Sequence, residues 1–210
     1  MRAFVSVPLV ALLSALAGRP LPAQQARPWF VALRAVPTAF GSAASSDNAT
    51  ADELGDLGPA PDLRGTLSVG RQFGRWEAAV SGGYGKHGLR GSNGGSSVTI
   101  QPGYTLATLG VTAAYAIVTT AHGARVQVFA GPTVSFWSGD AVPDSRTRLG
   151  GTGGIGLVAP VAGRLSVDAH AALGLASSPI DAEELSGLES DYETGAMWSR
   201  ELGVGLRLSF

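Results

Sequence analysis

The C-terminal stretch 201–210 alternates strictly between apolar and polar side chains up to the last residue. One face carries Leu202, Val204, Leu206, Leu208 and Phe210, and the other carries Glu201, Gly203, Gly205, Arg207 and Ser209. Side chains of a strand alternate between its two faces, so this pattern predicts a β-strand with one apolar and one polar face. The edge of a soluble sheet could also have this pattern, so the rest of the chain must decide between a soluble and a membrane-spanning sheet.

The same strand resembles the C-terminal signature strand of bacterial outer-membrane β-barrels, in which a glycine is followed by alternating apolar residues and a final phenylalanine. Gly205, Leu208 and Phe210 occupy the positions of that pattern. The resemblance implies that these three residues form the signal read by the barrel-assembly machinery, which is then an expected partner.

Residues 1–23 have the pattern of a secretory signal peptide. An arginine at the second position precedes an apolar run over 3–17, and small-residue cleavage sites end at Ala17 and at Ala23. We favour cleavage after Ala23, which leaves 24–210 as the mature chain. An uncleaved anchor helix is the alternative, and the short apolar run with a proline inside it disfavours that alternative.

The composition narrows the class of protein. The chain has 30 glycines, 15% charged residues and no cysteine, and its net charge is −1. An exported domain without cysteine cannot be held by disulfides, and a closed hydrogen-bonded barrel would replace them. No basic stripe suited to nucleic acid is present, so we expect neither a nucleic-acid partner nor a cofactor. The length allows one domain.

Alternation recurs along the chain and predicts eight strands. The expected strands are 29–40, 63–73, 76–84, 105–118, 125–136, 148–159, 165–177 and 198–210. Long connections at 41–61, 86–103, 137–147 and 178–196 alternate with short turns. Transmembrane barrels place brief turns at one end and extended loops at the other, and no open sheet edge survives inside a bilayer. We therefore predict an all-β fold, an eight-stranded antiparallel up-and-down transmembrane β-barrel.

The polar faces of these strands carry charges of both signs, which we place inside the barrel. The candidates are Arg34, Arg64, Glu77, Arg125, Arg148, Asp168, His170, Glu201 and Arg207. An eight-stranded barrel is only wide enough to be filled by side chains, and a buried charge is costly unless it is paired. We expect these groups to pair and plug the lumen. The excess of arginine leaves a narrow anion conduit as an alternative.

Aromatic residues gather near the ends of the expected strands. They are Trp29, Phe73, Trp76, Phe136, Trp137 and Trp198, with Tyr84 and Phe210 in similar places. Such residues form girdles at both interfaces of a bilayer. We expect all of them on the outer surface of the barrel.

The whole mature chain resembles the small eight-stranded outer-membrane barrels of the OmpA/OmpX type, over roughly residues 27–210. The resemblance implies a place in the outer membrane of a Gram-negative-type envelope, with the lipid bilayer and lipopolysaccharide as surroundings. The resemblance does not extend to a peptidoglycan-binding domain after Phe210, so we do not expect anchoring to the cell wall.

No catalytic constellation is evident, and we predict that the protein is not an enzyme and holds no metal. His87, His122 and His170 fall on an expected loop, a turn and the interior, so they do not converge. Some eight-stranded barrels modify lipid A, and His170 with Asp168 is the nearest candidate pair. Its inward position in the middle of a strand suits a hydrogen-bond network better.

The last loop is acidic. It carries Asp181, Glu183, Glu184, Glu189, Asp191 and Glu193, with no lysine or arginine between Ser178 and Gly195. This pattern indicates a solvated negative rim, and divalent-cation binding is the sharper alternative because hard cations take carboxylate oxygens.

The expected function is a structural or surface-interaction role through long outer loops that meet a ligand the sequence does not identify. A narrow, porin-like pore for small solutes is the alternative. A lipid A-modifying enzyme and a soluble lipocalin-like binder are less favoured.

Overall fold

The structure is a computed structural model that describes residues 28–46, 54–93, 96–139, 142–181, 185 and 191–210. The expected signal peptide and its two cleavage sites lie outside the described residues. Within the described ranges, no helix is long and apolar enough to cross a membrane. The strands are β1 (Trp29–Phe40), β2 (Ala44–Ser45), β3 (Asp56–Pro59), β4 (Asp62–Phe73), β5 (Trp76–Asn93), β6 (Ser96–Thr119), β7 (Arg125–Gly139), β8 (Val142–Ala162), β9 (Leu165–Ser177), β10 (Glu193–Thr194) and β11 (Ala196–Ser209).

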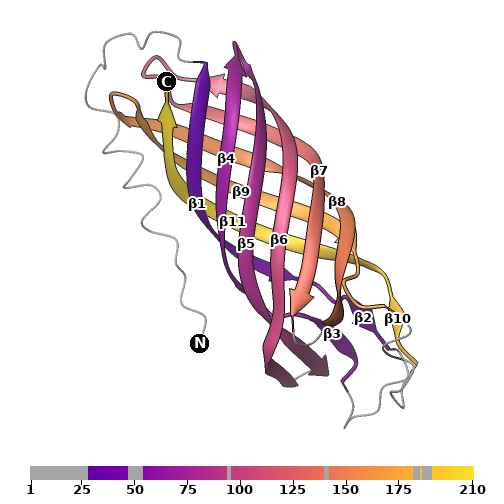
Figure 1. The fold of residues 1–210 in the computed structure, drawn as a ribbon. Coiled ribbons are helices and arrows are strands. Elements are labelled where there is room, and N and C mark those ends of the chain that lie inside the picture. Colours follow the sequence, from indigo (N-terminus) through magenta and orange to yellow (C-terminus); the bar gives the residue numbers. More distant parts are fainter. Residues whose placement is uncertain (1–27, 47–53, 94–95, 140–141, 182–184, 186–190) are drawn as a thin grey trace.

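Eight of these strands close into a barrel (Figure 1). Around the wall the order is β1, β4, β5, β6, β7, β8, β9 and β11, and every neighbouring pair is antiparallel. The first and last strands complete the ring, with Val31 opposite Leu208. The predicted eight-stranded antiparallel up-and-down barrel is therefore confirmed.

Short turns join the strands at the end of the barrel where the C-terminus lies (Figure 1). Gly74 between β4 and β5 has φ 62°, and Gly163 between β8 and β9 has φ 52°. Only glycine adopts this left-handed backbone at little cost, so the two hairpins depend on it. We call this the turn end, and the opposite end the outer end.

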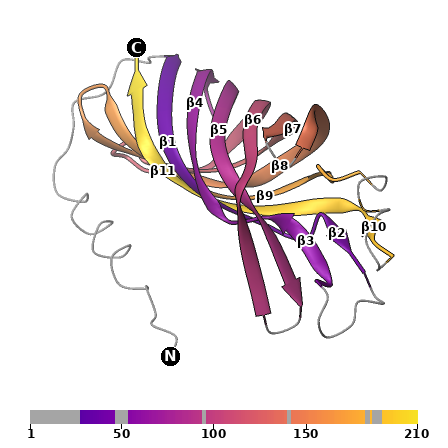
Figure 2. The same cartoon turned by 60° about the horizontal axis from the view of Figure 1, so that its bottom comes forward.

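The outer end is more regular than the sequence predicts. The expected loops at 86–103 and 137–147 are wrong, because β5 and β6 continue as a paired hairpin to Asn93 and Ser96, and β7 and β8 continue as a pair to Gly139 and Val142. Figure 2 shows β5 and β6 reaching past the barrel. A β-ladder is held by backbone groups, so the glycine- and serine-rich sequence of the first hairpin could continue it without an apolar period.

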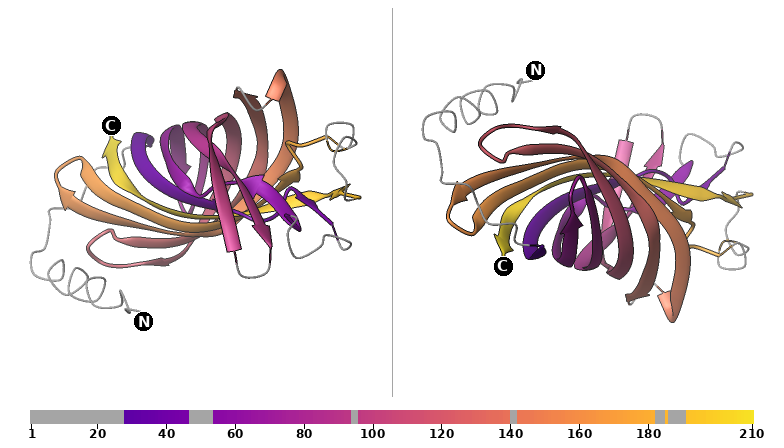
Figure 3. Two further views of the ribbon diagram at one scale, coloured as in Figure 1. Left: turned by 90° about the horizontal axis from the view of Figure 1, so that it is seen from below. Right: turned by 90° about the horizontal axis from the view of Figure 1, so that it is seen from above.

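Three short strands extend this outer layer. β3 pairs with the extension of β5, β2 pairs with β3, and β10 pairs with β2. The two views of Figure 3 show these elements gathered at one end of the barrel. The connections after β1 and after β9 thus meet each other outside the wall.

The outer wall of the barrel is apolar. Each barrel strand contributes large exposed hydrophobic side chains, among them Leu33, Leu67, Val80, Leu109, Val128, Ile155, Leu173 and Leu206. A water-soluble barrel would turn such residues inward. A wall of this kind suits the hydrocarbon core of a bilayer.

Most of the expected girdle residues lie on this outer wall. Trp29, Phe73, Trp76, Tyr84, Phe136, Trp198 and Phe210 are all exposed. Trp137 is the exception: it is 1% exposed and lies inside the barrel, so its prediction as a girdle residue is wrong. Because β7 continues to Gly139, alternation carries on past Phe136 and turns the next residue inward.

Candidate functional site: the lumen and its outer cap

Arg34 on β1 and Asp168 on β9 form a two-point ion pair in the lumen, on either side of Gly205 of the intervening strand β11. The guanidinium donates from Nε to Oδ1 at 2.8 Å and from Nη2 to Oδ2 at 2.7 Å. The third nitrogen, Nη1, donates to Ser68 Oγ at 2.8 Å. Parallel hydrogen bonds between a guanidinium and a carboxylate are among the strongest polar contacts in proteins, so this pair ties β1 to β9.

A second ion pair joins β4 to β11. Arg64 Nη2 lies 2.8 Å from Glu201 Oε1, and both side chains are largely buried. Gly83 and Gly85 of β5 leave room beside Arg64, since a Cβ on either would lie about 3.3 Å from the arginine side chain. The absence of side chains on one strand therefore accommodates the large cation of its neighbour.

Two arginines share one carboxylate near the turn end. Arg207 Nη2 donates to Glu77 Oε2 at 2.7 Å, and Arg125 Nη2 lies 3.8 Å from the same oxygen. The guanidinium of Arg207 also stacks 3.5 Å above the ring of Phe30, a favourable cation–π contact. Phe30 in turn covers Gly70, where a Cβ would overlap its ring. These groups fill the lumen next to the turns, and we call them the floor.

Two of the predicted interior residues stand apart from these pairs. His170 faces inward and meets the ring of Phe129 edge-on at 5.9 Å between ring centroids. Arg148 lies at the outer end and contacts Asp181, not the acids of the lumen. Its prediction as a member of the same network is therefore wrong, because β8 places it above the carboxylates that it was expected to meet.

An apolar cluster covers the outer end of the lumen, and we call it the cap. Its buried members are Ala43, Ala44, Leu57, Tyr104, Leu106, Trp137, Ile180, Leu185 and Met197, with Phe40, Leu54, Leu89 and Tyr192 packed against them. The cap draws on the strands β1, β5, β6, β7 and β11 and on the connections after β1 and after β9. The inward positions of Leu106 and Met197 could have been found from alternation, but their apolar character gave no reason to assign them to a polar lumen.

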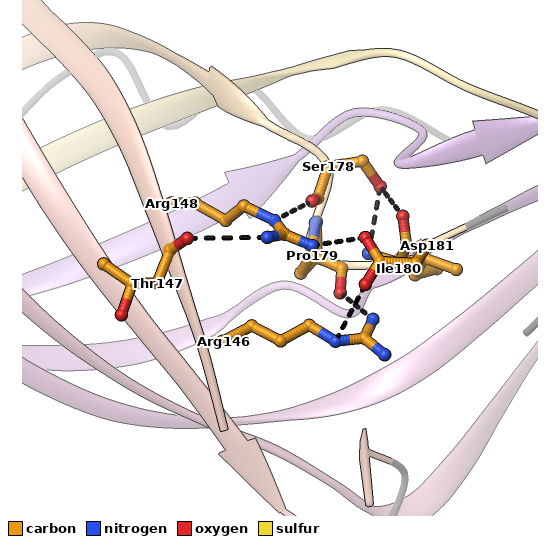
Figure 4. Close-up of polar contacts among 7 residues, drawn as sticks. All are labelled: Arg146, Thr147, Arg148, Ser178, Pro179, Ile180 and Asp181. Atoms are coloured by element: carbon orange, nitrogen blue, oxygen red, sulfur yellow. Dashed lines mark hydrogen bonds and ion pairs between the residues drawn. The ribbon is translucent and has the colours of Figure 1, made fainter. Parts of the chain in front are cut away.

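Two arginines of β8 hold the loop after β9 against the cap (Figure 4). Arg148 donates from Nε to the carbonyl of Ser178 at 2.6 Å, and Arg146 donates from Nη1 to the carbonyl of Pro179 at 2.6 Å. Both also pair with the carboxylate of Asp181, Arg148 at 2.5 Å and Arg146 at 3.3 Å. Ile180, between these anchored residues, is buried in the cap. We call this arrangement the latch.

The latch changes the interpretation of the acidic loop. Asp181 is engaged by arginines of another strand, so it does not stand as an unpaired charge at the rim. Asp191 and Glu193 are exposed, whereas Glu183, Glu184 and Glu189 lie outside the described residues. Among the described residues, no group of three or more histidines, cysteines and acids could hold a metal ion.

The three histidines occupy unrelated places. His122 is exposed in the turn between β6 and β7, and His170 lies in the lumen. His87 is 2% exposed beneath the cap, with its ring 5.0 Å from Phe40 and its Nδ1 3.3 Å from the carbonyl of Ala60. Burial lowers the pKa of His87 below its ordinary value. This residue lies beyond Tyr84, the last apolar side chain on the outer face of β5, and hence outside the membrane-spanning part.

Between the floor and the cap the lumen contains a cavity of about 150 Å³. Arg34, Arg64 and Glu201 line one side of it, and hydroxyl groups and glycines line the other, including Thr108, Thr133, Ser135 and Thr152. Phe40, Leu106, Trp137 and Met197 form its ceiling. Charged groups thus fill one end of the interior and apolar packing covers the other, with a small polar chamber between them.

Comparisons with known proteins agree with this architecture. No protein-family model matches the chain, and no curated protein matches its sequence. Among solved structures, it is similar to Neisserial surface protein A (NspA), with a TM-score of 0.54 and 17% identity over 87% of this chain and 97% of that chain. It is also similar to the outer membrane protein OprG from Pseudomonas aeruginosa, with a TM-score of 0.58 and 11% identity over 89% and 98%.

A third similar structure is a major outer membrane protein from Thermus thermophilus, with a TM-score of 0.50 and 12% identity over 87% of this chain and 99% of that chain. Sequence identities this low carry information about fold alone. Taken with the closed ring of strands and the apolar outer wall, they show that this chain has the fold of the small eight-stranded outer-membrane β-barrel proteins.

Proposed function

We propose that this protein is an outer-membrane barrel with a closed lumen, and that it acts as a structural or surface-interaction protein through its capped outer end. One observation supports the proposal: the floor, where two arginines share Glu77, and the apolar cap lie at opposite ends of the lumen, and each would be an obstruction. A conducting pore needs a continuous wet path, and either obstruction interrupts it.

The outer end offers a folded surface for contact. The hairpin of β5 and β6 and the short strands β2, β3 and β10 project beyond the wall, and all of them except β10 contribute residues to the cap. We propose that this surface meets the extracellular ligand. Lys86 and Arg200 are exposed near the same end, where the phosphates of lipopolysaccharide would lie beside them. The C-terminal residues Gly205, Leu208 and Phe210 remain the proposed signal to the barrel-assembly machinery.

The remaining alternatives are less well supported. His170 and Asp168 face the lumen, and Asp168 is occupied by Arg34, so this pair does not suit attack on a membrane lipid. A soluble lipocalin-like binder would need an apolar interior and a polar wall, the reverse of the arrangement here. A narrow pore keeps one supporting observation, the polar chamber inside the lumen.

Planar-bilayer recordings of the refolded protein test the proposal. A closed barrel gives no steady conductance. A variant that lacks only the floor or only the cap should also stay closed, because the other obstruction is still in place. Reproducible conductance steps from the unchanged protein would overturn the proposal and favour the narrow pore.

A further inference from the structure

The chamber inside the lumen has a chemistry of its own. Three of its lining residues have buried polar atoms without a hydrogen-bond partner in the part of the chain that the structure describes: Arg64 Nε, Thr66 Oγ1 and Trp137 Nε1. Arg64 is 8% exposed and Trp137 is 1% exposed, so bulk water does not reach them freely. A buried polar group without a partner is costly, and each such group needs an explanation.

A hydrogen-bond acceptor would satisfy these three groups. A guanidinium N–H and an indole N–H can only donate, and a threonine hydroxyl can donate as well. Of the nitrogens of Arg64, Nη2 is directed to Glu201, while Nε has no hydrogen-bond partner among the described residues. The guest that complements this set is therefore one that accepts several hydrogen bonds at once.

The net charge of the lumen also favours a guest that is negatively charged. Arg34, Arg64, Arg125 and Arg207 face Glu77, Asp168 and Glu201, so the cations exceed the anions by one when His170 is counted as neutral. The excess arises at the floor, where two arginines share Glu77. An uncompensated charge away from water is unfavourable. Water would accept hydrogen bonds but would not neutralise this excess.

We propose that the chamber binds one small monovalent anion, such as chloride or nitrate, with Arg64, Thr66 and Trp137 as donors. The size agrees with this class of ligand. A cavity of about 150 Å³ is large enough for such an ion with a few waters, given that a water takes roughly 30 Å³. The floor lies at one end of the chamber and the cap at the other.

Fluorine NMR of protein labelled with 5-fluorotryptophan tests this site. The chain has four tryptophans, of which Trp29, Trp76 and Trp198 are exposed on the outer wall and Trp137 is buried in the cap. The protein is refolded into detergent in sodium gluconate and in mixtures with sodium chloride or sodium nitrate at constant ionic strength. Refolding in each salt lets the ion enter before the chamber closes. The Trp137→Phe variant identifies the Trp137 resonance.

The proposal expects a saturable shift of the Trp137 resonance with chloride and with nitrate, while the three other resonances stay in place. Thr66→Val should weaken the apparent affinity by about tenfold or more, the usual effect of losing a hydrogen bond to a charged group. Thr152→Val is the matched control: this hydroxyl lines the same chamber but donates to the carbonyl of Leu173, so its loss should leave the affinity unchanged.

Two results would overturn the proposal. A Trp137 resonance that is the same in gluconate, chloride and nitrate would mean that water alone fills the chamber. Equal affinities for Thr66→Val and Thr152→Val would contradict the assigned donors. Neither result depends on conductance, so failure of the anion site and failure of the closed-barrel proposal are separate outcomes.

Discussion

Gly205 packs directly against the backbone of Leu33, so that a Cβ at position 205 would overlap the carbonyl oxygen of Leu33. Gly205 lies opposite Arg34 on one side and opposite Asp168 on the other, in the row of the barrel that carries the central ion pair. Local packing therefore explains why position 205 of the closing strand is a glycine, whatever its part in assembly.

Replacing Gly205 by alanine should destabilise the barrel. The added methyl group must displace the backbone of β1, and overpacking of this kind costs about 1–3 kcal/mol. Urea unfolding of the refolded protein, followed by tryptophan fluorescence, measures the change. Gly65→Ala is the control, since nothing lies within 4 Å of a Cβ at that position of β4. Equal stabilities for the two variants would contradict the packing argument.

Asp168→Asn should be strongly destabilising, because it removes the charge that Arg34 requires inside the lumen. Breaking a buried ion pair by changing one partner costs about 3–5 kcal/mol, while changing both partners costs less. The double variant Arg34→Gln, Asp168→Asn should therefore recover part of the lost stability in the same urea titration. A double variant whose loss equals the sum of the two single losses would show that the pair is not coupled.

Asp181→Asn should loosen the latch without unfolding the barrel. The carboxylate is the group that Arg146 and Arg148 hold in common, so its loss weakens the contact between β8 and the loop after β9. We expect faster cleavage of that loop by added protease, with the barrel core resistant. Asp191→Asn, an exposed carboxylate of the same connection, serves as the control. Similar cleavage rates for both variants would count against the latch.

The cap should loosen in acid. Burial lowers the pKa of His87, so the folded cap binds the neutral ring better than the charged one. The groups around it are Phe40, Trp137, the carbonyl of Ala60, and the charges of Asp62 and Arg64. Stability from the neutral ring is present above the ordinary histidine pKa of about 6.5 and is lost as the pH falls through the lowered value.

Emission from Trp137, in protein whose other tryptophans are phenylalanine, measures this loosening. The spectrum should shift to the red as the pH falls. In the His87→Phe variant, which keeps a ring beside Phe40 and cannot be protonated, the shift should be absent. An identical shift in the variant would assign the acid response to another group.

The wall of the barrel could be predicted from the sequence because one face of every strand had to satisfy a bilayer. Leu206 and Leu208 on β11 illustrate this: strict alternation gave both the strand and the side that faces outward. The charged partners of the lumen followed from the same alternation. Which arginine meets which acid did not, since that depends on the stagger between strands.

The outer end was harder to predict because the rule that apolar side chains face outward and polar side chains face inward does not hold there. Trp137 follows an outward residue and so had to point inward, but its aromatic ring favoured a girdle assignment. Arg146 lay within an expected loop, and its contact with Pro179 joins β8 to a connection that is distant in sequence. Folded contacts of this kind depend on tertiary packing and leave no local pattern.

Gel migration of the detergent-extracted membrane fraction, with and without boiling, tests the central claim most directly. A closed barrel that spans the bilayer stays compact in the unboiled sample, so we predict a faster-migrating band that moves to the full-length position after boiling. A single unshifted band, with the protein recovered in the soluble fraction, would contradict the account of an outer-membrane barrel.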